Sequence, residues 1–183
     1  GLSTYGRHPV LQDTGHFFTE CHGILEGASD CLASKGFQVL SLEIDPGLAI
    51  FVVNTHIEAG GGEADETARA SNVEALIAGM ADLDTDAPLV FMGDTNLHPE
   101  DPIDGPLGQR FESELGLVDV CTLLDCPEPN RIDRIYIRSG AGASLEAVAW
   151  SVPEGFVGEN GVDLSDHNAI QAQIQWARTG ESD

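Results

Sequence analysis

Four short motifs in this sequence contain the residue types that phosphate chemistry uses. Two imidazoles can move a proton or stabilise an oxygen, and three carboxylates can bind a metal or orient a partner. The amide of Asn96 can hold a phosphate oxygen. The motifs, in chain order, are Asn54-Thr55-His56, Gly93-Asp94-Thr95-Asn96, Ile132-Asp133-Arg134-Ile135 and Ser165-Asp166-His167.

Each motif taken alone has a simpler explanation. A histidine after an apolar strand is more often structural than catalytic. Gly-Asp-x-Asn is common in turns, because Asp and Asn side chains bond their own backbone. Asp133 beside Arg134 could form a surface ion pair worth about 0–1 kcal/mol, and Asp166 could belong to a turn. The functional interpretation therefore depends on the four motifs acting together.

The elements expected around these motifs are mostly strands. Residues 37–44 and 48–55 mix apolar and polar positions around an Asp-Pro-Gly turn, which predicts a β-hairpin ending at His56. The continuously apolar residues 88–92 predict a strand buried on both faces that leads into Asp94. Further strands are expected over residues 132–138, 145–150 and 169–176, with a loop at residues 59–62. A helix is expected from Asp65, as its N-cap, to about Leu83, and a short one over residues 109–115.

Every motif lies where an apolar strand starts or ends, so all four are expected on one rim of a packed sheet. A rigid scaffold of this kind holds side chains as catalysis requires. The pattern favours an α+β sandwich, with sheets packed face to face and helices outside. No domain boundary is visible, so we expect one domain over residues 1–177 and a tail over residues 178–183.

The ordered motif set resembles the endonuclease/exonuclease/phosphatase superfamily, which has the deoxyribonuclease I fold. The resemblance covers residues 1–176, and Arg7-His8-Pro9 stands where the family usually has Arg-Tyr-Pro. It implies a four-layer αββα sandwich. In the family, a strand with an Asn and a segment with a metal-binding Glu precede the part that corresponds to Gly1. The domain is therefore expected to be incomplete at its N-terminus.

The resemblance also implies roles for the motif residues that face the phosphate. Asp94 would orient or deprotonate the attacking water, and Asn96 would hold a phosphate oxygen. His56 would contact the phosphate and assist the leaving group. Residues 30–37 are similar to the Ala-x-Lys-Gly segment of the neutral sphingomyelinase branch. Lys35 could therefore meet the phosphate as a point charge, although it could equally be an ordinary loop lysine.

The remaining roles concern proton transfer and the metal. By the same resemblance, His167 would stabilise developing charge or transfer a proton, and Asp133 would fix its tautomer. Asp166 would help to bind a divalent cation, with Mg²⁺ expected and Mn²⁺ or Ca²⁺ as alternatives. Carboxylate and water ligands suit such hard cations.

The implied function is metal-dependent hydrolysis of a phosphodiester, and the substrate is open. A sphingomyelinase-like enzyme acting on phospholipid head groups or small phosphodiesters is expected. A nuclease is the alternative, but nuclease surfaces usually carry clustered Lys and Arg. This chain has eight basic residues and shows no cluster of them. A non-catalytic module that kept the fold is a third possibility, favoured only by the absence of the family's metal-binding Glu.

Composition suggests an unusual environment. The chain has 31 acidic residues and a net charge of −23, and its acids are dispersed along the sequence. Such a surface suits molar salt, where the Debye length falls to about 3 Å and self-repulsion is screened. The rival explanation is an acidic surface that holds Ca²⁺ or Mg²⁺ in an ordinary protein.

Four cysteines form two pairs that are close in sequence, and four cysteines permit three connectivities. Disulfides within the pairs would indicate an oxidising compartment, whereas free buried thiols would not. No apolar stretch approaches the roughly 20 residues of a transmembrane helix. The first residues do not resemble a secretory signal. An extracellular location is expected over a cytoplasmic one.

Overall fold

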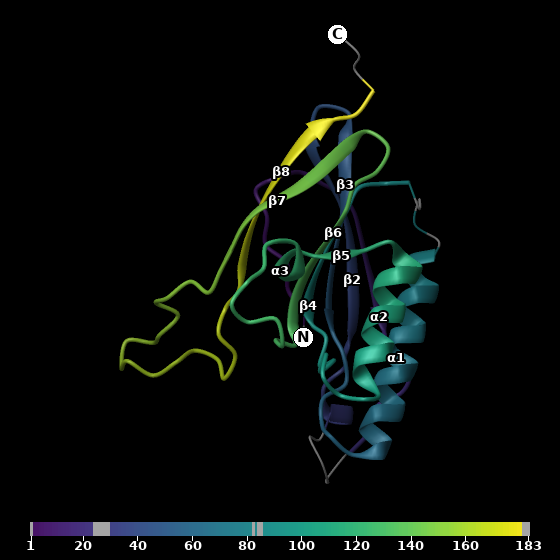
Figure 1. Ribbon diagram of the computed structural model, residues 1–183, viewed down its shortest axis with the longest axis vertical. Coiled ribbons are helices and arrows are strands. Elements are labelled where there is room, and N and C mark those ends of the chain that lie inside the picture. Colours follow the sequence, from purple (N-terminus) through teal and green to yellow (C-terminus); the bar gives the residue numbers. More distant parts are fainter. Residues whose placement is uncertain (1, 24–29, 82, 84–85, 181–183) are drawn as a thin grey trace.

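The computed structural model describes residues 2–23, 30–81, 83 and 86–180, which form two sheets and flanking helices (Figure 1). The larger sheet contains six strands. Their spatial order is β1 (Val10–Phe17), β2 (Gly36–Asp45), β3 (Leu48–His56), β4 (Leu89–Asp94), β6 (Asp133–Arg138) and β5 (Val118–Asp119). The smaller sheet pairs β7 (Ala143–Ser151) with β8 (Gln171–Arg178). The helices are η1 (Asp30–Leu32), α1 (Glu63–Ala81), α2 (Asp104–Leu115) and α3 (Val120–Leu123).

The six-stranded sheet is packed on both faces, as its apolar strands require. Helices α1 and α2 cover one face, and Phe91 of β4 packs there with Leu76 of α1 and Phe111 of α2. On the other face, Ile137 of β6 and Leu145 of β7 belong to a second apolar cluster that joins the two sheets. The described residues thus form a helix layer and two sheet layers, which confirms the α+β class.

Most of the expected elements are present. The hairpin, the long helix and the strands at residues 88–92, 132–138, 145–150 and 169–176 correspond to β2–β3, α1, β4, β6, β7 and β8. The short helix begins at Asp104 instead of residue 109. The Asp101 carboxylate accepts the N–H groups of Ile103 and Asp104 at 2.8 and 3.1 Å, which starts the helix early.

The predicted N-cap of the long helix is wrong. Helix α1 begins at Glu63, which makes Asp65 its third residue. The Asp65 carboxylate reaches back to accept the Gly62 N–H at 3.0 Å, and it also contacts His22 Nδ1 at 2.6 Å. Burial alone would raise the pKa of Asp65, but these two contacts and the charge of Arg69 lower it. Asp65 thus satisfies a backbone donor at the helix start from inside the helix.

Strand β1 was not predicted, because its side chains are exposed at most positions and carry little apolar alternation. It forms through backbone pairing with β2, where Thr14 lies opposite Val39. Short β5 and α3 were also not predicted.

The structure pairs Cys21 with Cys31 and Cys121 with Cys126 as disulfides, so it does not contain the free thiols considered above. Within the described part of the chain, no helix combines the length and apolar character that a bilayer crossing requires.

Candidate active site

Three of the predicted residues form a row across adjacent strands of the large sheet. In the parallel pairing of β3 with β4, His56 is the register partner of Asp94. In the antiparallel pairing of β4 with β6, Asp94 is the partner of Asp133. The three side chains therefore start from neighbouring backbone positions at one edge of the sheet. Three of the four motifs therefore meet on one rim, as expected, whereas the fourth lies in the connection between β7 and β8.

The end of β4 depends on a glycine. Gly93 has φ +144°, and a Cβ there would lie 2.1 Å from the Thr55 carbonyl oxygen of β3. Any larger residue would push β3 and β4 apart at the point where His56 and Asp94 are placed. The glycine therefore permits the close approach of the two strands that brings these side chains together.

The residues after Gly93 fold back onto both neighbouring strands. Both the backbone N–H and the hydroxyl of Thr95 donate to the Ile132 carbonyl, at 2.9 and 2.7 Å. Asn96 has φ +47°, in the left-handed region that Asn tolerates well. Its N–H donates to Asp94 Oδ1 at 3.0 Å, and its side-chain amide donates to the Ile57 carbonyl at 3.0 Å. These bonds fix the loop relative to β3 and β6.

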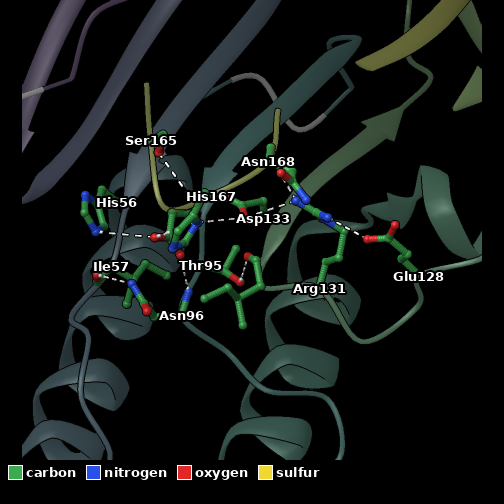
Figure 2. Close-up of polar contacts among 12 residues, drawn as sticks. His56, Ile57, Thr95, Asn96, Glu128, Arg131, Asp133, Ser165, His167 and Asn168 are labelled. Atoms are coloured by element: carbon green, nitrogen blue, oxygen red, sulfur yellow. Dashed lines mark hydrogen bonds and ion pairs between the residues drawn. The ribbon is translucent and has the colours of Figure 1, made fainter. Parts of the chain in front are cut away.

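His167 reaches the row from the long connection between β7 and β8, as Figure 2 shows. Its Nδ1 lies 2.9 Å from Asp133 Oδ2 and 3.9 Å from Asp94 Oδ2. Because Nδ1 is committed to a carboxylate, Nε2 is the ring atom through which His167 would act on a substrate. Partial burial lowers the pKa of His167, but the charges of Asp133, Asp94 and Asp166 outweigh this and raise it above its ordinary value.

Asp94 lies between the two histidines. Its Oδ2 is 3.5 Å from His56 Nε2 and 3.9 Å from His167 Nδ1. The His56 side chain is about half exposed, at 45%, whereas the Asp94 side chain is 18% exposed. A carboxylate between two imidazoles can orient a water molecule and accept its proton.

Lys35 also lies at this site. Its Nζ donates to the Ile57 carbonyl at 2.9 Å, and the Asn96 amide donates to the same oxygen at 3.0 Å. The two residues predicted to bind phosphate, Lys35 and Asn96, are therefore brought together. Their contact with a phosphate stays a prediction.

Asp166 lies at the margin of this arrangement. It is exposed, and together with Asp133 and His167 it lines a shallow hollow of about 310 Å³. Among the described residues, the group whose ligand atoms lie within 4.8 Å of one another consists of Asp94, Asp133 and His167, without Asp166. The predicted metal-binding role of Asp166 stays a prediction.

The Asp94, Asp133 and His167 group offers ligand atoms that could hold a divalent metal ion. Two carboxylates can supply oxygen ligands to Mg²⁺, which usually takes one or two carboxylates together with waters and substrate phosphate oxygens. The hydrogen bond between His167 and Asp133 competes for one of these oxygens. The donor set therefore fits a hard cation that is only partly coordinated by protein.

Sequence reasoning did not identify Thr95 or Arg131 as parts of the site. Arg131 precedes Asp133 by two residues, and its guanidinium contacts Asp133, Glu128 and the Asn168 carbonyl. The spacing of two residues between Arg131 and Asp133 could have indicated this contact, because side chains at positions i and i+2 of a strand share a face. Thr95 lies inside a predicted motif, but its two bonds to Ile132 depend on strand pairing.

Comparisons with known proteins identify the fold. No protein-family model matches the chain. Solved structures with a similar fold include the endonuclease/exonuclease/phosphatase from Beutenbergia cavernae, with a TM-score of 0.59 at 17% identity over 94% of this chain and 46% of that one. The chain therefore has the deoxyribonuclease I-like fold, as its motifs predicted.

Other comparisons lie within this class. The sphingomyelinase of Mycobacterium bovis is 27% identical over an alignment that covers 92% of this chain and 35% of that protein. The chain thus spans about a third of that relative's length. The Staphylococcus aureus beta toxin with bound magnesium ions has a TM-score of 0.59 at 18% identity over 91% of this chain and 65% of that one. D. rerio TDP2 complexed with single-strand DNA product has a TM-score of 0.63 at 16% identity, over 91% of this chain and 68% of that one. The predicted resemblance to the superfamily, and to sphingomyelinases within it, is confirmed.

Proposed function

We propose that this protein is a divalent-metal-dependent phosphodiesterase that acts on phospholipid head groups, as a sphingomyelinase does. The observation that carries the proposal is the convergence of Asp94, Asp133 and His167 within 4.8 Å, with His56 Nε2 3.5 Å from Asp94. The similarity to a sphingomyelinase supports the choice of reaction.

The arrangement supports attack by water on phosphorus. Asp94 holds the water and takes its proton, and Asn96 with Lys35 contacts the phosphate oxygens. His167 acts on the phosphate through Nε2, either stabilising the developing charge or transferring a proton, while Asp133 fixes its tautomer. His56, on the other side of Asp94, assists the leaving group. Asp94 and Asp133 would hold the cation, with Asp166 as a further ligand. The chemistry such a cation supplies is Lewis-acid polarisation of a phosphoryl oxygen.

A surface loop beside the site favours a lipid substrate. The connection between β7 and β8 forms a small hairpin, bridged between Val157 and Asp163, that projects from the body of the molecule (Figure 1). It exposes large apolar side chains, with Phe156 57% and Leu164 69% exposed. Residues of the same connection line a hollow that includes His167. Apolar groups exposed next to a polar site suit contact with a lipid surface.

The charge narrows the lipid class. With 31 acidic and 8 basic residues, the protein is repelled by an anionic membrane at low salt. Zwitterionic head groups carry no such penalty. A choline phosphate head group therefore fits the protein better than a phosphatidylserine surface does.

A nuclease is the second candidate. The observation in its favour is the similarity to TDP2, whose structure contains a single-strand DNA product. The scarcity and dispersal of basic residues argue against it at low salt, because phosphate-backbone contacts rely on Lys and Arg.

The test compares three substrates: sphingomyelin vesicles, plasmid DNA and bis-p-nitrophenyl phosphate. Each is incubated at low and high salt with Mg²⁺, Mn²⁺, Ca²⁺ or EDTA, using both this chain and the full-length gene product. We expect metal-dependent release of choline phosphate that is lost in Asp94→Ala. Asp45→Ala, at the opposite end of β2 from the site, is the matched control. Cleavage of DNA alone would establish the nuclease. If neither protein cleaves any substrate with any metal, the non-catalytic alternative replaces the proposal.

We also propose an extracellular, high-salt setting. The two disulfides support an oxidising compartment. The net charge of −23 supports high ionic strength.

A further inference from the structure

Arg131 connects two segments of the site that are far apart in the sequence. Its Nη1 contacts the Glu128 carboxylate at 2.6 Å, and its Nη2 donates to the Asn168 carbonyl at 2.8 Å. The same Nη2 lies 3.8 Å from Asp133 Oδ2, the oxygen that contacts His167 (Figure 2). One side chain therefore touches the carboxylate that orients His167 and the residue that follows His167.

Glu128 lies two residues after a cross-linked turn. The Cys121–Cys126 disulfide closes this turn, and the Cys126 N–H donates to the Cys121 carbonyl at 2.9 Å. Arg134 of β6 donates to the Pro129 carbonyl at 2.6 Å. Arg134 also forms a buried ion pair at 2.8 Å with Asp119, which caps α3. Glu128 thus lies between a cross-linked turn and Pro129, which is bonded to β6.

The segment that carries His167 has few such attachments. Within the described chain, hydrogen bonds join residues 152–170 to the rest of the molecule at two places, His167 to Asp133 and Asn168 to Arg131. Its other hydrogen bonds are internal, such as Gly158 to Val162 and His167 to Ser165. The Arg131 contact therefore supplies a large part of what holds His167 in place.

We propose that Arg131 is a positioning residue, which keeps residues 165–168 against β6 so that His167 Nδ1 stays on Asp133. Glu128 and the cross-linked turn are its support. The catalytic part of this inference rests on the proposed function, but the structural part does not.

A direct contact with substrate is the competing role, and the geometry disfavours it. The Arg131 side chain is 14% exposed, and its Nε is buried without a hydrogen-bond acceptor among the described residues. Both terminal nitrogens already have partners in the protein. Little of the guanidinium can reach a phosphate.

The test replaces Arg131 by Met and compares it with Arg110→Met. Arg110 also bridges two segments through carboxylates, Glu74 of α1 and Glu114 of α2, but it lies away from the site. For Arg131→Met on the preferred phosphodiester we expect kcat to fall about tenfold to 100-fold with KM within twofold, because a misplaced catalytic group costs rate and not binding. Arg110→Met should keep its kcat, and Arg131→Lys, which can retain a contact with Asn168, should recover part of the loss.

A second readout needs no activity. Backbone ¹⁵N relaxation should show faster local motion at His167 and Asn168 in Arg131→Met than in Arg110→Met or the wild type. Glu128→Gln, which removes only the supporting charge, should give a smaller change of the same kind and should serve if Arg131→Met does not fold. Unchanged relaxation at both residues would overturn the inference, whatever the activity. A raised KM with unchanged kcat would overturn it too, in favour of substrate contact. If ¹⁵N relaxation at His167 and Asn168 changes in Arg131→Met but the wild type hydrolyses no phosphodiester, only the proposed function is contradicted.

Discussion

Replacing Asp133 by Asn should lower the pKa of His167. Partial burial already lowers that pKa, and the attraction of Asp133 is the largest of the opposing influences that raise it. The substituted amide would keep the shape of the side chain but would lose the charge 2.9 Å from His167 Nδ1. Its nitrogen can also turn toward the ring and favour the wrong tautomer. Asp94 and Asp166 would continue to raise the pKa, so the expected change is a partial fall.

The same substitution should affect activity far more than stability. The Asp133 and His167 side chains are 22% and 36% exposed, so the pair contributes at most about 1 kcal/mol to folding. That corresponds to a fall in Tm of about 2–4 °C at this chain length. A histidine with the wrong tautomer loses its acid–base role, which accounts for about 10²–10⁴-fold in rate. Whichever protonation state of His167 is active, its limb of the pH–rate profile should move to lower pH.

The pKa is measurable by NMR from the C2 proton of each histidine between pH 4 and 9, with the His167 signal assigned through His167→Gln. Asp166→Asn is the matched control, because Asp166 acts on His167 by charge without a hydrogen bond and should cause a smaller fall. A His167 midpoint that stays unchanged in Asp133→Asn would refute the reasoning. So would a midpoint that rises.

Three other predictions concern the fold and its surroundings. Gly93→Ala should destabilise the protein by about 3 kcal/mol or more in urea unfolding, because its Cβ would meet the Thr55 backbone; Gly61→Ala, which meets nothing within 4 Å, should change stability by less than about 0.5 kcal/mol. Burial, followed by the charge of Asp119, raises the pKa of Glu112. A carboxyl whose pKa is higher in the folded than in the unfolded protein stabilises the fold below the unfolded-state pKa, and this stabilisation is lost as the pH rises through the folded-state pKa. Glu112→Gln should therefore raise Tm at pH 7 and lose that advantage near pH 4, and equal effects at both values would contradict this. If the acidic surface is adapted to high salt, Tm should rise between 0.1 and 2 M KCl, and a flat or falling Tm would oppose that proposal.

The sequence indicated where the motif residues lie better than how the strands that carry them pair. Apolar strands end at His56 and Asp94 and begin at Asp133, so the meeting of these residues on one rim could be inferred from strand ends alone. The strand register could not be inferred, because it depends on pairing between distant segments. This register places the three residues in one row. Exposed β1 escaped prediction because it has little apolar alternation, and its strand state comes from pairing with β2.

The supporting contacts were equally beyond sequence reasoning. In the sequence Arg131 is simply a charged residue that precedes a strand. Its hydrogen bond to the Asn168 carbonyl joins positions that only tertiary structure brings together. Lys35 and Asn96 were both assigned to phosphate, but nothing in their spacing shows that they share the Ile57 carbonyl. The motifs predict which side chains could take part in chemistry, whereas the contacts that orient each group arise from folding.

The most direct measurement of the central claim is metal-dependent release of choline phosphate from sphingomyelin vesicles, with Asp94→Ala beside the wild type. We predict release with Mg²⁺, none with EDTA, and none from a folded Asp94→Ala protein. Undiminished release by Asp94→Ala, or by the wild type in EDTA, would contradict the account of one metal-assisted site built on the row of His56, Asp94 and Asp133.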